Sequence, residues 1–343
     1  MMRLPSYRYR APKTIADAAA WLAESPTDTM LLAGGTDLIP NMKRRQQTPA
    51  TVVGLRGIAA LSEVQARDGF VVGAGVTLTS LVRDERVRAQ YAGLWQAVAQ
   101  IATPHLRNMG TIGGNICLDT RCTYYDQSAE WRQAINFCLK KDGDTCWVAT
   151  SSDRCLAVSS TDSAPALIAL GATVRLVSAS GARDVALTDL YANDGMHYLT
   201  RRADEILTSV RLPAMDGWRS TYWKLRRRGS FDFPVAAVAA AARFDGHKVV
   251  EARLVLGAVA SRPLEAPAAS ARLAGQALSD DLIALAADDA YALAKPMDNT
   301  DFELVWRKKV VRSLVTSALR ELRGDDMREA RTKLARHPLI VVS

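Results

Sequence analysis

The spacing of apolar positions changes several times along the N-terminal part of the chain, and each change predicts a new element. Residues 13–24 carry apolar side chains three and four positions apart, which is helical spacing, and Thr14 with Asp17 forms an N-cap signature. The face that this helix should bury consists of Ile15, Ala18, Ala19 and Leu22. Residues 29–45 predict a short buried strand, a glycine turn and a second helix. The other predicted segments are strands within 50–58, 69–78, 172–187 and 204–213, helices in 79–102 and 164–171, and a loop over 103–115.

The pattern becomes simpler after residue 216. Three strand-like runs cover residues 220–227, 234–244 and 249–259, and Asp245-Gly246 joins the last two as a hairpin turn. Two long helical patterns follow, in 266–294 and 302–323. The chain therefore predicts an α+β fold without internal repeats. Its expected units are a two-subdomain α/β domain over 1–215, a C-terminal domain of a small sheet and helices over 216–325, and a tail over 326–343.

Composition and charge narrow the class of protein. The 343 residues are 48% hydrophobic and 23% charged, which is ordinary for a globular chain. No apolar stretch is long enough for a membrane span, and the first residues do not resemble a signal peptide, so we expect a cytoplasmic protein. The net charge is +8, but basic and acidic residues alternate, which disfavours nucleic-acid binding. A basic face that docks an acidic protein agrees better with this pattern.

Two glycine-rich loops are the first candidates for a binding site. Gly34-Gly35-Thr36 separates a predicted strand from a helix, and residues 107–115 read RNMGTIGGN. Such turns expose backbone N–H groups to a phosphate, and glycine lets the phosphate approach closely. Neither loop is the GxGxxG fingerprint of a Rossmann fold. Each loop alone is also compatible with a tight turn that requires glycine.

Taken together, the loops resemble those of the flavin-binding subunits of the molybdenum hydroxylase family, which includes xanthine dehydrogenase and the medium subunit of carbon monoxide dehydrogenase. The segments TDSAPALIALGATVRL, DEILTSVRLP and YWKLRRRGSFDFPVAAVAAAARF extend the resemblance over nearly the whole chain. The resemblance implies an FAD held between two α/β subdomains, with the pyrophosphate between the loops. The implied cofactor-binding residues are Leu31, Leu32, Ala33, Gly34, Gly35, Thr36, Asp37, Ile101, Thr111, Ile112, Gly113, Gly114, Asn115, Asp162, Leu207 and Lys224.

All five cysteines lie between residues 117 and 155. In most of the family the second glycine loop continues almost directly into the segment that begins here at Asp162, so residues 120–160 are an insertion. Four cysteines of this insertion are candidate metal ligands: Cys122, Cys138, Cys146 and Cys155. Four thiolates suit an iron–sulfur cluster or zinc. The spacing lacks the close pair usual in zinc sites, which favours the cluster. Zinc and unliganded structural cysteines remain alternatives.

The insertion resembles that of a reductase branch of the family, in which it carries a [4Fe-4S] cluster. This resemblance implies a ferredoxin donor, and partner subunits that carry the molybdenum cofactor and [2Fe-2S] clusters, two copies of each chain. Cys117 precedes the insertion and is expected to be a packed, unliganded residue. Basic residues of the insertion are candidates for ferredoxin docking: Arg121, Arg132, Lys140, Lys141 and Arg154. The alternatives are a flavin subunit that uses NAD(P)H, and a zinc-stabilised binding module without redox chemistry.

Overall fold

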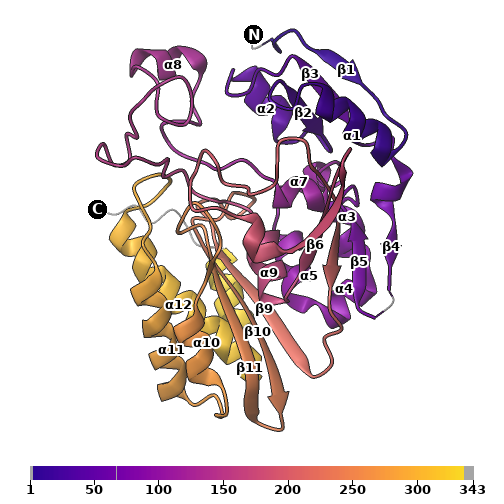
Figure 1. The fold of residues 1–343 in the computed structure, drawn as a ribbon. Helices are drawn as coiled ribbons and strands as arrows, with labels where there is room; N and C mark the ends of the chain where they lie inside the picture. The colour runs from indigo at the N-terminus through magenta and orange to yellow at the C-terminus, as the bar shows by residue number, and fades with distance from the viewer. Residues whose placement is uncertain (1–2, 67, 336–343) are drawn as a thin grey trace.

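The computed structural model describes residues 3–66 and 68–335. Within them the chain forms three separate sheets and flanking helices, the α+β architecture expected from the sequence (Figure 1). No helix among the described residues is both long enough and apolar enough to span a membrane.

The N-terminal subdomain is a parallel three-stranded sheet of order β1-β3-β2. Its elements are β1 (Arg8–Arg10), α1 (Ile15–Glu24), β2 (Thr29–Leu32), α2 (Leu38–Lys43) and β3 (Thr51–Gly54). The predicted cap of α1 is confirmed, because the Thr14 hydroxyl accepts the Asp17 N–H at 3.0 Å. Ala18, Ala19 and Leu22 are buried against the sheet, whereas Ile15 is partly exposed.

The second subdomain is an antiparallel sheet of order β4-β5-β8-β6-β7 with helices on one side. Its strands are β4 (Val64–Gln65), β5 (Phe70–Gly73), β6 (Thr173–Ser178), β7 (Gly181–Ala186) and β8 (Ile206–Leu212). Its helices are η1 (Ala59–Ser62), α3 (Leu78–Arg83), α4 (Glu85–Gln90), α5 (Ala92–Ala99), α6 (Pro104–Arg107), α7 (Ile112–Ile116), α9 (Ser163–Ala169) and η2 (Leu187–Leu190).

Two predictions for this subdomain need correction. The helical pattern over 79–102 is broken into α3, α4 and α5, and Asp84 caps α4 by accepting the Arg86 N–H at 2.9 Å. The expected loop over 103–115 contains the short helices α6 and α7. Thr103 and Thr111 cap them with their hydroxyl groups, so two threonines assigned to a loop are helix N-caps.

The C-terminal domain is an antiparallel sheet of order β12-β11-β10-β9, buried on both faces. Its elements are β9 (Trp218–Leu225), β10 (Ala236–Asp245), β11 (Lys248–Gly257), β12 (Leu264–Glu265), α10 (Pro267–Leu273), α11 (Asp280–Leu293) and α12 (Leu304–Arg323). In β10, Ala237 and Ala239 face the second subdomain, while Val238 and Ala240 face the helices. This two-sided burial explains why β10 is apolar from Ala236 to Ala242.

The insertion projects from the body of the molecule and carries only one helix, α8 (Ala129–Ala134) (Figure 1). It is closed at its base by an antiparallel bridge between Arg121 and Val158, with N–H···O distances of 2.8 and 2.7 Å. It contacts the C-terminal domain through Asn299, whose side-chain amide donates to the Leu156 carbonyl at 2.6 Å. Of the predicted tail, residues 328–335 form α13 (Arg328–Ala335) against α12 and β9, and 336–343 lie outside the described residues.

Candidate functional site

A large cleft lies where the two N-terminal subdomains, the base of the insertion and the loop before β10 meet. Its volume is about 780 Å³, which is the size expected of a site for a large organic ligand. Both glycine loops line it, together with Ile101, Leu207 and Asp162. The sequence therefore identified segments that meet in space although they are far apart along the chain.

The first glycine loop follows β2 and requires its glycines for two different reasons. Gly35 has a φ of +74°, a left-handed conformation that favours glycine. A Cβ on Gly34 would collide with the backbone carbonyl of Met109, so the two loops touch each other. Among the described residues, the backbone N–H groups of Gly34, Gly35 and Thr36 have no protein acceptor. They remain free to bind an anionic ligand in the cleft.

The second glycine loop is the first turn of α7. Thr111 caps this turn by accepting the Gly114 N–H at 3.1 Å. A Cβ on Gly113 would lie 2.6 Å from the Cβ of Ala74, so this glycine allows the helix to pack against the sheet. A Cβ on Gly114 would meet only the Thr111 hydroxyl at 3.1 Å and the Ala33 Cβ at 3.9 Å. Because Gly114 also lines the cleft, its missing side chain leaves space for a ligand.

Most of the residues predicted to bind the cofactor line this cleft. They are Leu31, Leu32, Ala33, Gly34, Gly35, Thr36, Asp37, Ile101, Thr111, Gly113, Gly114, Asn115, Asp162 and Leu207. Ile112 and Lys224 do not. Ile112 is 1% exposed in the core beneath α7, and the side chain of Lys224 is completely buried.

Lys224 is connected to the cleft through Asp162. Its Nζ lies 3.0 Å from Asp162 Oδ2, and the Tyr222 hydroxyl donates to Asp162 Oδ1 at 2.7 Å. Burial raises the pKa of Asp162 and lowers the pKa of Lys224, while the attraction between the two charges opposes both shifts. Lys224 and Tyr222 therefore fix the position of the Asp162 side chain, and Asp162 is the member of the ion pair that lines the cleft.

Several lining residues were not predicted from the sequence. They are Met109, Leu118, Asp119, Arg121, Tyr198, Arg201, Arg228 and Phe233. Arg121 forms a close ion pair with Asp37 and lies with its Cζ 4.8 Å from the centroid of the Phe233 ring. Met109 lies in the second glycine loop, and Arg228 and Phe233 lie in the quoted segment 222–244, so these three had a local signal. The remaining residues are brought to the cleft by contacts between distant segments, and no local pattern marks them.

The four cysteines of the insertion form a second, smaller site. Cys122, Cys138, Cys146 and Cys155 are each at most 7% exposed and line one small cavity, together with Tyr124, Tyr125, Lys140 and Trp147. None of the five cysteines forms a disulfide. Cys117 lies outside this cavity and lines the large cleft, as its position before the insertion suggested.

The thiols of this cavity influence one another. Burial raises the pKa of Cys122 to about 12 and that of Cys155 to about 11, and neighbouring cysteines of the cluster contribute to both increases. A positive group bound between them would favour the thiolate forms. In the part of the chain that the structure describes, no group of three or more His, Cys, Asp or Glu residues is arranged to hold a single metal ion.

The expected docking surface of basic residues is wrong for three of its five members. Arg121 is 8% exposed and Arg132 1% exposed, and the Lys140 side chain is 6% exposed in an ion pair with Asp119. Only Lys141 and Arg154 reach the surface. The buried residues hold the insertion together: Arg132, for example, donates to the Arg44 carbonyl at 2.9 Å.

The fold, the large cleft and two matching family models together define an FAD-binding oxidoreductase subunit. Residues 5–215 match the family described as the FAD binding domain in molybdopterin dehydrogenase, and residues 220–322 match the CO dehydrogenase flavoprotein C-terminal domain. The chain belongs to this family of FAD-binding subunits of molybdenum hydroxylase-type oxidoreductases.

Individual relatives agree over nearly the full length. The FAD-binding subunit of an aldehyde oxidoreductase from Escherichia coli is 31% identical over 92% of this chain and 99% of its own length. The medium chain of carbon monoxide dehydrogenase from Afipia carboxidovorans is also 31% identical, over 92% and 96%. The solved carbon monoxide dehydrogenase from Hydrogenophaga pseudoflava superposes with a TM-score of 0.77 at 27% identity, covering 94% of this chain and 98% of its own.

Proposed function

We propose that this chain is the FAD and [4Fe-4S] subunit of a 4-hydroxybenzoyl-CoA reductase. In this proposal, electrons from reduced ferredoxin enter at the cluster, pass to FAD and leave to a [2Fe-2S] subunit and a molybdenum subunit. In the molybdenum subunit, two of these electrons and two protons would serve the reductive removal of the para hydroxyl of 4-hydroxybenzoyl-CoA as water, giving benzoyl-CoA. The observation that most directly supports this proposal is that four buried cysteines from one insertion line a single cavity next to the large cleft.

The four cysteines that line this cavity suit a cluster of several iron atoms better than a single zinc ion. In a tetrahedral zinc site with Zn–S bonds of about 2.3 Å, the sulfur atoms lie only about 3.8 Å apart. The four cysteines are separated by 15, 7 and 8 residues and lack the close pair of ligands that is usual in zinc sites. A cubane cluster needs four thiolates held farther apart, and four is the number that this insertion supplies. A redox-active group is also the more useful neighbour for a flavin.

Residues of this chain position the two cofactors and do not react with the substrate. The loop N–H groups of Gly34, Gly35 and Thr36 line the cleft without a protein acceptor among the described residues, which supports a role in binding the FAD pyrophosphate. Asp162 also lines the cleft, which supports a role in cofactor binding. When bound, the flavin exchanges one or two electrons and the cluster one, which suits a junction between one-electron carriers. The base of the insertion, at Asp119 and Arg121, separates the two sites.

Metal, sulfide and flavin analysis of the complex purified without oxygen tests this proposal. We expect about one FAD and four iron atoms with matching acid-labile sulfide for each copy of this chain, in addition to the iron of the [2Fe-2S] subunit. Zinc in place of this iron would contradict the cluster and support the zinc-stabilised alternative.

The electron donor is tested on the same complex. Reduced ferredoxin should bleach the flavin absorbance and support formation of benzoyl-CoA from 4-hydroxybenzoyl-CoA. Reduction of the flavin by NADH or NADPH, without a response to ferredoxin, would favour the alternative of an NAD(P)-linked flavin subunit.

A further inference from the structure

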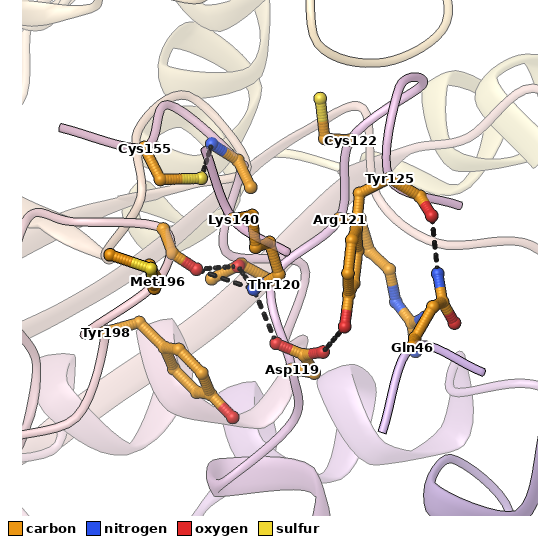
Figure 2. Close-up of polar contacts among 12 residues, drawn as sticks. Gln46, Asp119, Thr120, Arg121, Cys122, Tyr125, Lys140, Cys155, Met196 and Tyr198 are labelled. Carbon is orange, nitrogen blue, oxygen red and sulfur yellow. Dashed lines mark hydrogen bonds and ion pairs between the residues drawn. The ribbon is translucent and has the colours of Figure 1, made fainter. Parts of the chain in front are cut away.

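Lys140 is the charged residue that the proposed electron path leaves unexplained. Its Nζ donates three hydrogen bonds: to Asp119 Oδ1 at 2.7 Å, to the Thr120 hydroxyl at 2.6 Å and to the Gly195 carbonyl at 2.6 Å. The side chains of Lys140 and Asp119 are 6% and 5% exposed. Figure 2 shows this ammonium group between the cysteine side and Asp119. The ion pair is therefore held in one geometry and is shielded from solvent.

The two ends of the ion pair belong to different sites. Lys140 lines the cysteine cavity but not the large cleft, and Asp119 lines the large cleft but not the cysteine cavity. Two aromatic rings near Lys140 also belong to different sites. Lys140 Nζ lies 4.8 Å from the ring centroid of Tyr125, which lines the cysteine cavity, and 5.4 Å from that of Tyr198, which lines the cleft. The pair thus spans the wall between the sites with its positive end toward the cysteines.

The positive charge acts on the cysteine side. Lys140 lines the cavity formed by the four cysteines, and its side chain and these cysteines are at most 7% exposed, so little water screens the charge there. The same charge favours the more negative state of any redox group held by these sulfurs. Net charge and hydrogen bonding around a cluster are the main protein controls of its reduction potential.

The contribution of this ion pair to the stability of the fold is a weak explanation for its presence. Burying two charges costs about as much as their attraction returns, so an apolar pair of similar volume would serve a purely structural wall equally well. A buried charge between two redox sites has an additional effect, because Coulomb interactions are stronger where water is excluded.

We propose that the Lys140–Asp119 ion pair sets the difference in reduction potential between the group held by the four cysteines and the flavin. Lys140 raises the potential of the cysteine-bound group, and Asp119 opposes reduction of the flavin. The inference rests on the proposed function, since it requires a redox group in both sites. Lys140 and Asp119 are positioning residues in this scheme, because neither ligates a metal nor reacts with a substrate.

The test compares two adjacent lysines in the whole complex. Lys140→Met removes the buried charge and keeps the side-chain length. Lys141→Met removes the same charge from a side chain that is 32% exposed and paired only with Asp142. Asp119→Asn keeps the shape of the carboxylate and removes its charge. The readouts are the midpoint of the cluster signal in a redox titration followed by electron paramagnetic resonance, the flavin midpoint from visible absorbance, and the iron and flavin content.

We expect opposite shifts from the two partners of the ion pair. Lys140→Met should lower the cluster midpoint by roughly a tenfold change in the one-electron equilibrium, about 59 mV. Asp119→Asn should raise both the cluster midpoint and the flavin midpoint, and Lys141→Met should leave both unchanged. Structural damage would not produce shifts of opposite sign in variants that remove opposite charges.

The possible failures are distinguishable. If the wild-type insertion holds no iron, the proposed function falls and this inference falls with it. If the variants retain iron and flavin but all midpoints stay at wild-type values, only the inference is overturned. If Lys140→Met loses its iron, the Asp119→Asn titration decides, and an unchanged or lowered cluster midpoint there overturns the inference.

Discussion

The side-chain oxygen of Asn115 accepts a hydrogen bond of 2.6 Å from the hydroxyl of Ser163, 48 residues later in the chain. The same oxygen accepts the Ser163 N–H at 3.1 Å and the Thr161 hydroxyl at 2.9 Å. Asn115 ends the second glycine loop, and Ser163 begins α9 directly after Asp162. One amide oxygen therefore joins the chain segments before and after the insertion at the wall of the FAD cleft.

Replacing Asn115 should weaken both the fold and flavin binding. Asn115→Ala leaves three buried donors without their acceptor, which should cost about 1–3 kcal/mol of unfolding free energy. Because the loop is no longer tied to α9, FAD content should fall as well. Asn115→Asp keeps the acceptor oxygen and should retain more flavin. Thermal unfolding and the ratio of flavin to protein absorbance measure both effects, and equal flavin loss in the two variants would contradict this role for the oxygen.

Substitutions of the neighbouring glycines Gly113 and Gly114 should affect different properties, stability and FAD content. Gly114→Val should reduce FAD content with little loss of stability, since a side chain there enters the cleft. Gly113→Val should destabilise the fold by about 1–3 kcal/mol, because its side chain collides with Ala74. Flavin content at matched folded fraction separates the two. Full FAD occupancy in Gly114→Val would show that the second loop does not contact the cofactor.

Four of the five cysteines should be ligands of the proposed cluster, and one should not. Serine substitutions of Cys122, Cys138, Cys146 and Cys155 should each lose iron or trap a damaged cluster while FAD stays bound. Cys117→Ala should keep the cluster and lose at most about 1 kcal/mol of packing. Iron per flavin across the five variants decides the assignment. Iron loss in Cys117→Ala with retention in one of the others would show that the ligand set is different.

The buried ion pair of Lys224 and Asp162 can be tested with a double variant that should regain part of the stability lost in a single variant. Lys224→Met leaves a buried carboxylate unpaired and should cost about 3–5 kcal/mol. The double variant Lys224→Met/Asp162→Asn carries no buried charge and should regain part of that stability. Its FAD content should stay low, because the charge of the cleft-lining residue Asp162 is gone. Normal FAD content in the double variant would exclude Asp162 from cofactor binding.

Glu205 should make the cleft sensitive to acid. Hydrogen bonds from Arg183 at 2.7 and 2.9 Å hold the pKa of Glu205 below its usual value, and the Glu205 carbonyl accepts from Arg201, which lines the cleft. The stabilisation from a lowered carboxyl pKa is complete above the unfolded value of about 4.3 and is lost as the pH falls through the folded value.

Glu205→Gln should therefore lower the unfolding temperature at pH 7, and its difference from wild type should shrink as the pH approaches 3. Asp184→Asn is the matched control on the same sheet, since its ion pair with Arg175 is 60% and 53% exposed and should contribute little. A constant difference between Glu205→Gln and wild type across this pH range would exclude the ionised carboxylate as the cause.

Local patterns predicted more of this protein than charge did. The predicted strands, the α1 cap, the Asp245-Gly246 hairpin and the first glycine turn each depend on neighbouring residues, and the structure has them where they were expected. Lys140 and Lys141 are adjacent and chemically identical, yet one is buried and one is exposed. Only contacts with Asp119 and Gly195 distinguish them, and those residues lie 21 and 55 positions away. The contacts that separate the cysteine cavity from the large cleft were for this reason not predictable from the sequence.

The Arg121–Val158 bridge brings the two ends of the cysteine segment together. Two backbone hydrogen bonds close its base, so the chain leaves and re-enters the flavin domain at one point. The strands before and after this segment still share one sheet, because β5 and β6 both pair with β8. A change in the length of residues 122–157 is therefore a local change that leaves the sheet beside the large cleft in place.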